Sequence, residues 1–409
     1  MKNLAINFLK IFFLSLFFPF SSLAQTDPCE NGRYIDNVFT STISTLDIKY
    51  GENVSVGGNT VELFADVFEP ENDSEPKRPL MILMHGGSYT TGERSDIHNL
   101  CEAYALKGYV VASINYRLYD GPFFPFPDST DLGEVLVQSV GDAKAAVRFF
   151  KNDAATANEF GIDTNIIIMG GVSAGAITAL HVAHMDENDD FPNFIDVILS
   201  NNGGLEGNSN NLFQHSSKVH GVINFSGALY RDHFLDANET PVFSVHDDMD
   251  AIVPYGNGFA VVAIIPIVRM NGSELVHARA LNEGVESRLI TYENSAGHVS
   301  FFPDDRQELV DTTASFMAHQ LICNTPTSSK ELRREASHKI YPNPGQNLLY
   351  IENSAAIARV QVRSITGKVV PVLYNGENLD ISVLDNGIYL IELYDQNDQR
   401  INIQKLIKQ

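Results

Sequence analysis

One short segment constrains this chain more than any other, because it predicts a strand, a sharp turn and a helix in succession. The apolar run 166–169 is followed by Gly171-Val172-Ser173-Ala174-Gly175, and helix-forming residues occupy 176–185. Small residues on both sides of the serine let the strand and the helix approach closely. Since a serine hydroxyl is a weak nucleophile without a base, such a turn would present Ser173 to a neighbouring base.

Three further segments supply the other groups that such a serine needs. An apolar run ends in His85-Gly86-Gly87-Ser88, whose glycines can direct backbone N–H groups towards a developing oxyanion. A second run leads into the acidic segment 246–255, and the strand-like segment 287–292 leads to Gly297-His298. The order is oxyanion loop, serine, acid and histidine, which is expected of α/β-hydrolases and differs from the orders of chymotrypsin and subtilisin.

Residues 55–322 resemble the secreted α/β-hydrolase carboxylesterases and lipases. Residues 85–87 resemble the family's oxyanion loop, and 115–118 resemble the segment after its next strand. Residues 171–175 resemble its nucleophile elbow, 246–255 its acid loop and 297–298 its histidine loop. Two positions depart from the family pattern. Ser88 stands where many relatives have a third glycine, and Asp247 replaces the glycine that usually follows His246.

The resemblance implies a catalytic role for three residues. Ser173 would attack a carbonyl carbon, and His298 would take its proton and later return it to the leaving alcohol. The departure at Asp247 leaves three acids, Asp247, Asp248 and Asp250, that could orient the imidazole. Matching the acid loop residue by residue selects Asp250.

The oxyanion hole is predicted to consist of the backbone amides of Gly86, Gly87 and Ala174. His85 is expected to shape this loop rather than to carry protons. The remaining histidines of interest are interpreted as surface or core residues; these are His181, His184 and His246.

The body of the chain alternates strand and helix patterns. Its strands are continuously apolar, which indicates a sheet covered on both faces and therefore a doubly wound, mostly parallel α/β fold. Ligands of such sheets bind beyond the carboxyl ends of the strands, where all candidate catalytic residues fall. The predicted strands are 79–84, 109–114, 166–169, 219–225, 242–245 and 287–292, and the predicted helices are 97–106, 137–158, 176–185 and 304–321.

Two segments are candidates for the walls of the substrate cleft. Phe123, Phe124 and Phe126 lie among prolines in the loop 121–127, and three such side chains must pack or bind something. Packing under their own loop is the alternative to substrate binding. The mostly apolar segment 258–270 favours a buried helix, with a lid or part of an acyl pocket as alternatives.

Both ends of the chain differ from its body. Two lysines and an apolar run within residues 1–24 predict a secretory signal peptide. A hydrolase domain over 25–324 would follow, and then a polar linker over 325–338. Residues 339–409 contain short strand patterns separated by turn residues, which predict a small all-β, sandwich-like domain.

Three motifs in this last domain resemble the C-terminal sorting domain of the type IX secretion system of Bacteroidetes. They are 340–344, 364–368 and 386–389. The resemblance implies the type IX machinery as a partner and a secreted or cell-surface location. A small immunoglobulin-like binding module is the structural alternative.

The three cysteines suggest one disulfide and one free thiol. Cys101 falls on an apolar helical face, whereas Cys29 and Cys323 lie at the two ends of the hydrolase domain and could pair. The sequence has no CxxC, HExxH or EF-hand spacing, so no metal and no cofactor are expected. A net charge of −23 disfavours nucleic acid as a partner. No membrane span is expected, since no second apolar stretch of spanning length follows the signal peptide.

We therefore expect a secreted serine esterase that hydrolyses carboxylic esters with apolar acyl, aromatic or polyester-like groups through an acyl-enzyme. A serine peptidase of the prolyl-oligopeptidase type shares the fold and triad order, and a non-catalytic surface protein could use the same scaffold. The glycines 86–87 favour the esterase, because those peptidases usually build the oxyanion hole partly from a tyrosine. The complete set of serine, acid, histidine and glycines argues against a non-catalytic scaffold.

Overall fold

The computed structural model describes residues 28–122, 124, 126–262, 265–323, 340–351, 354, 357–364, 369–376, 378–394 and 400–409. The chain divides into two compact units, Met1–Thr325 and Pro326–Gln409. The predicted signal peptide and linker, 1–24 and 325–338, lie outside the described residues.

The first unit is built on an eight-stranded sheet with the order β1-β2-β4-β3-β5-β6-β8-β11. β2 is antiparallel to both of its neighbours, and the strands from β4 to β11 run parallel. This confirms the predicted doubly wound, mostly parallel α/β fold. The strands are β1 (Thr42–Val54), β2 (Thr60–Pro70), β3 (Arg78–Met84), β4 (Val110–Ile114), β5 (Ile162–Val172), β6 (Gly221–Phe225), β8 (Val242–Asp247) and β11 (Ser287–Tyr292).

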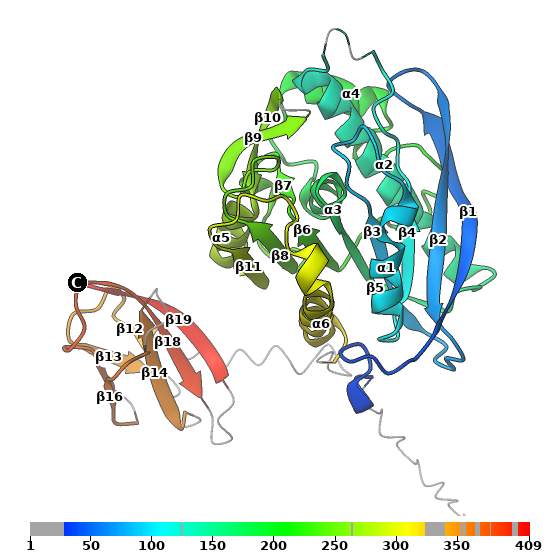
Figure 1. Cartoon of the computed structure of the whole chain (residues 1–409). Helices are drawn as coiled ribbons and strands as arrows, with labels where there is room; N and C mark the ends of the chain where they lie inside the picture. Colours follow the sequence, from blue (N-terminus) through cyan, green and yellow to red (C-terminus); the bar gives the residue numbers. More distant parts are fainter. Residues whose placement is uncertain are drawn as a thin grey trace, which may run out of the picture. The chain divides into compact units, whose positions relative to one another are not determined.

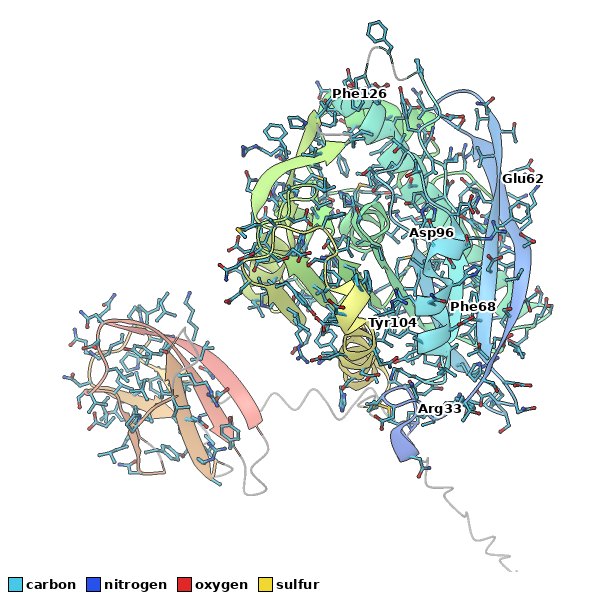
Figure 2. The ribbon with its side chains drawn as sticks, in the orientation of Figure 1. Arg33, Glu62, Phe68, Asp96, Tyr104 and Phe126 are labelled. Carbon is cyan, nitrogen blue, oxygen red and sulfur yellow. A yellow bond between two sulfur atoms is a disulfide. The ribbon has the colours of Figure 1, made fainter. Side chains whose placement is uncertain are left out.

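Helices cover both faces of this sheet (Figure 1). Alternate residues of β3 divide between two cores: Leu80 and Ile82 pack with α2 and α3, whereas Met81 and Leu83 pack with α1 and α6. Tyr104 of α1 points towards α6, as Figure 2 shows, and its hydroxyl lies 2.5 Å from Thr313 Oγ1. The helices are α1 (His98–Ala105), α2 (Ser129–Ala155), α3 (Ala174–His184), α4 (Asn193–Asn201), α5 (Ser273–Glu283) and α6 (Phe302–Leu321).

One helix of the first unit begins earlier than predicted, and one hairpin was not predicted. α2 begins at Ser129 rather than at 137, because Asp128 and Asp131 form a capping box that satisfies the first amides of the helix. The edge hairpin of β1 and β2 was not predicted. β1 is largely exposed and lacks the continuous apolar run that marked the central strands.

The prediction of a buried helix over 258–270 is wrong. This segment forms β9 (Asn257–Val262) and β10 (Ile265–Gly272), which pair with each other. β10 also pairs with β7 (Ala228–Leu229), which gives a separate three-stranded antiparallel sheet. Its many β-branched residues favour strands, and Pro266 is incompatible with a helix interior.

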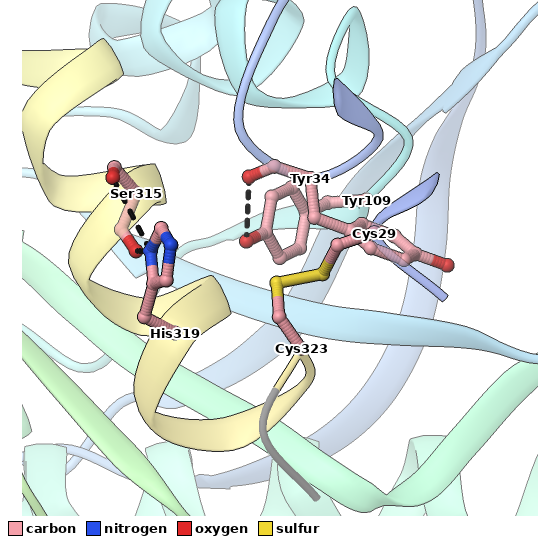
Figure 3. The surroundings of a disulfide bond; sticks show 6 residues. All are labelled: Cys29, Tyr34, Tyr109, Ser315, His319 and Cys323. Atoms are coloured by element: carbon pink, nitrogen blue, oxygen red, sulfur yellow. Dashed lines mark hydrogen bonds between the residues drawn. A yellow bond between two sulfur atoms is a disulfide. The ribbon is translucent and has the colours of Figure 1, made fainter. Parts of the chain in front are cut away.

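A disulfide closes the first unit by joining its two ends. Cys29 is bonded to Cys323 across a sequence separation of 294, as Figure 3 shows. Nearby, the Tyr109 hydroxyl donates to the carbonyl oxygen of Tyr34 at 3.1 Å. Cys101 is a buried free thiol, as predicted.

The second unit consists of two four-stranded sheets with the orders β12-β13-β17-β16 and β15-β14-β18-β19. Leu349 and Leu379 of the first sheet share a core with Val362, Ile391 and Leu393 of the second. The small all-β domain is therefore confirmed. Its strands are β12 (Ile340–Tyr341), β13 (Leu348–Ile351), β14 (Arg359–Ser364), β15 (Val369–Val370), β16 (Leu373–Tyr374), β17 (Asn378–Asp380), β18 (Gly387–Tyr394) and β19 (Arg400–Lys408).

Candidate active site

Ser173 occupies the sharp turn between β5 and α3. Its φ of 54° and ψ of −117° lie outside the regions that non-glycine residues normally adopt, and its amide donates to the carbonyl oxygen of Phe225 at 2.8 Å. The elbow glycines permit this turn. A Cβ on Gly171 would lie 2.5 Å from the carbonyl carbon of Gly175, and one on Gly175 would lie 2.3 Å from Met84 O. Only glycine therefore fits at either position.

His298 connects Ser173 to Asp250. Its Nε2 lies 2.8 Å from Ser173 Oγ, and its Nδ1 lies 2.6 Å from Asp250 Oδ2. The three residues follow β5, β8 and β11, which run parallel in one sheet, so their carboxyl ends open at the same edge. The structure thus brings together the serine, histidine and acid predicted from the sequence.

Asp250 is held as a buried carboxylate. Its Oδ1 accepts hydrogen bonds from the amides of Ile252 and Val253, and His246 Nε2 lies 3.4 Å from its Oδ2. Burial alone would raise the pKa of Asp250, but the hydrogen bonds from His246, His298 and the Ile252 amide lower that pKa to about 2. The carboxylate is therefore ionised at neutral pH and can stabilise an imidazolium on His298.

The two neighbouring acids bind the histidine loop instead. Asp247 accepts hydrogen bonds from the amide and the hydroxyl of Ser300. Asp248 accepts from the amides of Asn294 and Ser295 at 2.9 and 3.0 Å. Of the three candidate acids, Asp250 is the one hydrogen-bonded to His298.

The predicted oxyanion residues border the nucleophile. A Cβ on Gly86 would lie 3.3 Å from Ser173 Cβ, so the loop passes directly beside the serine. Gly87 has a φ of 118°, and a Cβ there would lie 2.1 Å from Thr91 O. Ala174 is the first residue of α3, and its amide has no acceptor within the helix.

Two tyrosines that were not predicted as part of the site support the oxyanion loop. The Tyr89 hydroxyl donates to the carbonyl oxygen of Ala174 at 2.9 Å, which ties the loop to the start of α3. The Tyr116 hydroxyl donates to His85 O at 2.7 Å. The His85 ring stacks on Tyr116 and places Nδ1 2.7 Å from Gly86 O. The hydroxyl group of a buried tyrosine needs a hydrogen-bond partner, but the sequence alone does not reveal which partner it finds.

An apolar cavity adjoins Ser173. Its walls come from α2, α3, α4 and the β9–β10 hairpin, and none of its lining residues is charged. Ala260, Val262 and Met270 of the hairpin face this cavity. The hairpin therefore forms part of the pocket beside the nucleophile, which was an alternative interpretation of its sequence.

The two described phenylalanines of the predicted loop are not among the residues that line this cavity. The Phe124 side chain is 94% exposed, and Phe126 is half-buried. Neither lines the cavity, and Phe123 lies outside the described residues. A role of the three side chains in substrate binding stays a prediction.

Two further observations concern metals and membranes. Within the described part of the chain, no group of three or more His, Cys, Asp or Glu side chains is arranged to hold a metal ion. None of the helices found there combines the length and apolar character needed to cross a membrane.

Two regions of the sequence match known families. Residues 65–230 match the BD-FAE family, an esterase family of α/β-hydrolases, and residues 339–409 match the secretion system C-terminal sorting domain. No curated protein matches the chain.

Among solved structures, the chain is similar to esterase 2 of Thermogutta terrifontis. The form phosphorylated by paraoxon is 18% identical with a TM-score of 0.50, and the match covers 69% of this chain and 96% of that chain. The form phosphoramylated by tabun is 18% identical with a TM-score of 0.49, covering 69% and 97%. At this identity the likeness shows the fold alone.

The chain thus contains a region that matches an esterase family of α/β-hydrolases and a region that matches the type IX sorting domain. The sorting domain implies export through the secretion machinery to the cell surface or beyond.

Proposed function

We propose that this protein is a serine esterase that cleaves carboxylic esters through a covalent acyl-enzyme. The observation that carries the proposal is the chain of hydrogen-bonding distances from Ser173 Oγ through His298 to Asp250, next to the glycines of the oxyanion loop. Membership of residues 65–230 in an esterase family supports the same reaction.

In the acylation step, Ser173 Oγ attacks the ester carbonyl carbon while His298 Nε2 takes the hydroxyl proton. The amides of Gly86, Gly87 and Ala174 stabilise the resulting oxyanion, and each such donor contributes about 3 kcal/mol. The ester C–O bond then breaks, and the imidazolium returns the proton to the leaving alcohol.

Deacylation repeats these steps with water as the nucleophile. His298 takes a proton from the water, the hydroxide attacks the acyl carbon, and Ser173 leaves with the returned proton. Asp250 keeps the imidazole in the tautomer with Nδ1 protonated, because its ionised carboxylate accepts that hydrogen bond.

The apolar cavity supports substrates with apolar acyl groups, aromatic or aliphatic, over small hydrophilic ones. In the same proposal, residues 1–24 are a signal peptide that is removed on export, 25–324 are the catalytic domain, and 325–338 link it to the sorting domain.

The test combines a substrate comparison with active-site labelling. The purified protein should hydrolyse p-nitrophenyl butyrate and bind a fluorophosphonate probe at Ser173, while leaving peptide anilides intact. The Ser173→Ala variant serves as the control and should lose both ester hydrolysis and labelling. Cleavage of peptide anilides in preference to esters would favour a peptidase, and a folded protein that the probe does not label would contradict the proposal.

A further inference from the structure

We propose that the cavity beside Ser173 is a groove for one extended, apolar acyl chain of about 12 carbons, which runs along α3. This inference rests on the proposed esterase function and adds the substrate class: esters of medium- to long-chain aliphatic acids. Its evidence is the spacing of the lining residues, the chemistry of the walls and the position of His298 outside the cavity.

The lining residues of α3 set the length of the groove. Ile177 and His181 line it from within α3, and Ser173 and Met185, the residues just before and just after the helix, line it at the two ends. These positions are four residues apart and form one ridge inclined to the helix axis, so the cavity follows the helix for about 12 residues, or about 18 Å. Carbon–carbon bonds of about 1.5 Å advance an extended chain by about 1.25 Å per atom, so this length fits about 12–14 carbons.

The facing wall on α2 has the same helical character. Leu132, Gly133, Leu136 and Val137 line the cavity with the spacing of a single helical face. Gly133 is a costly residue inside a helix, but a Cβ there would lie 3.1 Å from Ile195 Cδ1. The glycine therefore lets α4 approach α2 and close the side of the groove.

The one imidazole that lines the groove, that of His181, has both ring nitrogens engaged within the protein. His181 Nδ1 lies 2.8 Å from the carbonyl oxygen of Ile177, and its Nε2 accepts from the amide of Tyr230 at 3.1 Å. Burial lowers the pKa of His181 to about 4, so the ring is neutral at neutral pH. A hydroxylated or charged acyl group would therefore lose its water without gaining a hydrogen bond from this imidazole.

The arrangement around Ser173 assigns the groove to the acyl side of the ester. Ser88, Tyr89 and Ala174 line the mouth, whereas His298 does not line the cavity. The leaving alcohol must lie within reach of His298 Nε2, because that atom returns its proton. The acyl chain is the part of the substrate that extends away from His298 and into the groove.

The first test measures kcat/KM for p-nitrophenyl esters from acetate to hexadecanoate at concentrations at which they remain monomeric. Each added methylene should raise kcat/KM about threefold to fourfold until the groove is filled near 12 carbons, after which the rise should stop. Efficient butyrate hydrolysis with no gain for longer chains would overturn the groove and leave the esterase proposal intact. Failure to cleave any ester would count against the esterase proposal itself.

A pair of isomeric esters then separates the acyl side from the alcohol side. Ethyl decanoate and decyl acetate have the same formula and carry the long chain on opposite sides of the ester bond. Ethyl decanoate should be hydrolysed with at least about tenfold higher kcat/KM, since only its acyl chain fits the groove. Preference for decyl acetate would overturn the assignment to the acyl side.

Two substitutions along α3 test the direction of the groove. Met185→Trp, or Met185→Phe if the first variant does not fold, should lower the dodecanoate-to-butyrate ratio of kcat/KM by about tenfold and leave the hexanoate-to-butyrate ratio within about twofold. Ile177 lies about two turns closer to Ser173, so Ile177→Phe should lower both ratios.

Val197→Phe is the matched control for added volume near the groove. Val197 is 60% exposed on α4 and does not line the cavity, so this variant should keep the wild-type chain-length profile. An equal loss for all chain lengths in Met185→Trp and Ile177→Phe would indicate a general structural effect and overturn the proposed groove.

Discussion

The two units of this protein use their strands in opposite ways. In the first unit, parallel strands end at one edge of the sheet, and the turns after β5, β8 and β11 bring three polar side chains into hydrogen-bonding distance. In the second unit, short antiparallel strands enclose a small core and expose apolar side chains such as Leu373 and Val383. The first arrangement brings polar side chains together at one edge, whereas the second leaves apolar side chains on its surface. We therefore expect all chemistry to reside in the first unit.

The largest effect should come from the nucleophile of the first unit. Ser173→Ala should lower kcat for p-nitrophenyl butyrate by about 10⁶-fold, because the members of a triad act as a unit. Adding His298→Ala to this variant should cause little further loss. Steady-state kinetics with unfolding curves of both variants checks the result. A folded Ser173→Ala variant with near-normal turnover would show that the reactive group lies elsewhere.

The acid loop allows a sharper comparison within the same unit. Asp250→Asn should lower kcat by about 10⁴-fold, because an amide favours the wrong imidazole tautomer. Asp247→Asn and Asp248→Asn serve as matched controls. Their carboxylates hold the histidine loop through Ser300 and the 294–295 amides, so their losses should be much smaller, about tenfold. If Asp247→Asn were the most damaging of the three, the orienting role would belong to that residue.

The relative positions of Ser173, Asp250 and His298 follow from the sequence more directly than the walls of the cavity do. Ser173, Asp250 and His298 each follow a strand, and the order of motifs along the chain constrains where those strands end. The cavity depends instead on how α2, α3, α4 and the β9–β10 hairpin pack. Packing joins residues far apart in the sequence, and a short apolar segment such as 258–270 can form either a strand or a helix.

Local signals in the sequence account for two further features of the structure. The capping box at Asp128 could have shown the true start of α2, because its spacing is visible in the sequence. The positive φ of Ser173 was implicit in the elbow motif. In contrast, nothing in the sequence indicates that the Tyr89 hydroxyl donates to Ala174, since that contact depends on the finished fold.

The disulfide should affect the stability of the first unit without affecting its chemistry. Replacing Cys29 and Cys323 with serine removes a cross-link across a sequence separation of 294 and should lower the free energy of unfolding by about 2–5 kcal/mol. Thermal unfolding measures this loss, and kcat at 25 °C should stay unchanged because the bond lies outside the triad. A variant as stable as the wild type would show that the two ends are held by packing alone.

The ionised Asp250 should make a smaller, pH-dependent contribution to the free energy of unfolding. Its folded-state pKa of about 2 lies below the usual value of 3.8, so the folded state binds this proton less tightly than the unfolded state. The stabilisation, roughly 2 kcal/mol, is fully present above about pH 4 and is lost as the pH falls towards 2. Between pH 4 and 2, wild-type stability should therefore fall more steeply than that of Asp250→Asn, as urea unfolding at each pH would show. Equal slopes would contradict the lowered pKa.

The smallest catalytic effect should follow removal of the whole second unit. A chain of residues 25–325 keeps the eight-stranded sheet, the closing helix α6 and the Cys29–Cys323 disulfide, so it should fold and turn over esters at the rate of the longer form. In a host with type IX secretion, the same truncation should hold the enzyme in the periplasm, because the sorting domain is missing while the signal peptide still acts. Cell fractionation with an activity assay measures both outcomes. Normal export of the truncated chain would contradict a sorting role for residues 339–409, and a folded but inactive truncated chain would show that the second unit contributes to the chemistry after all.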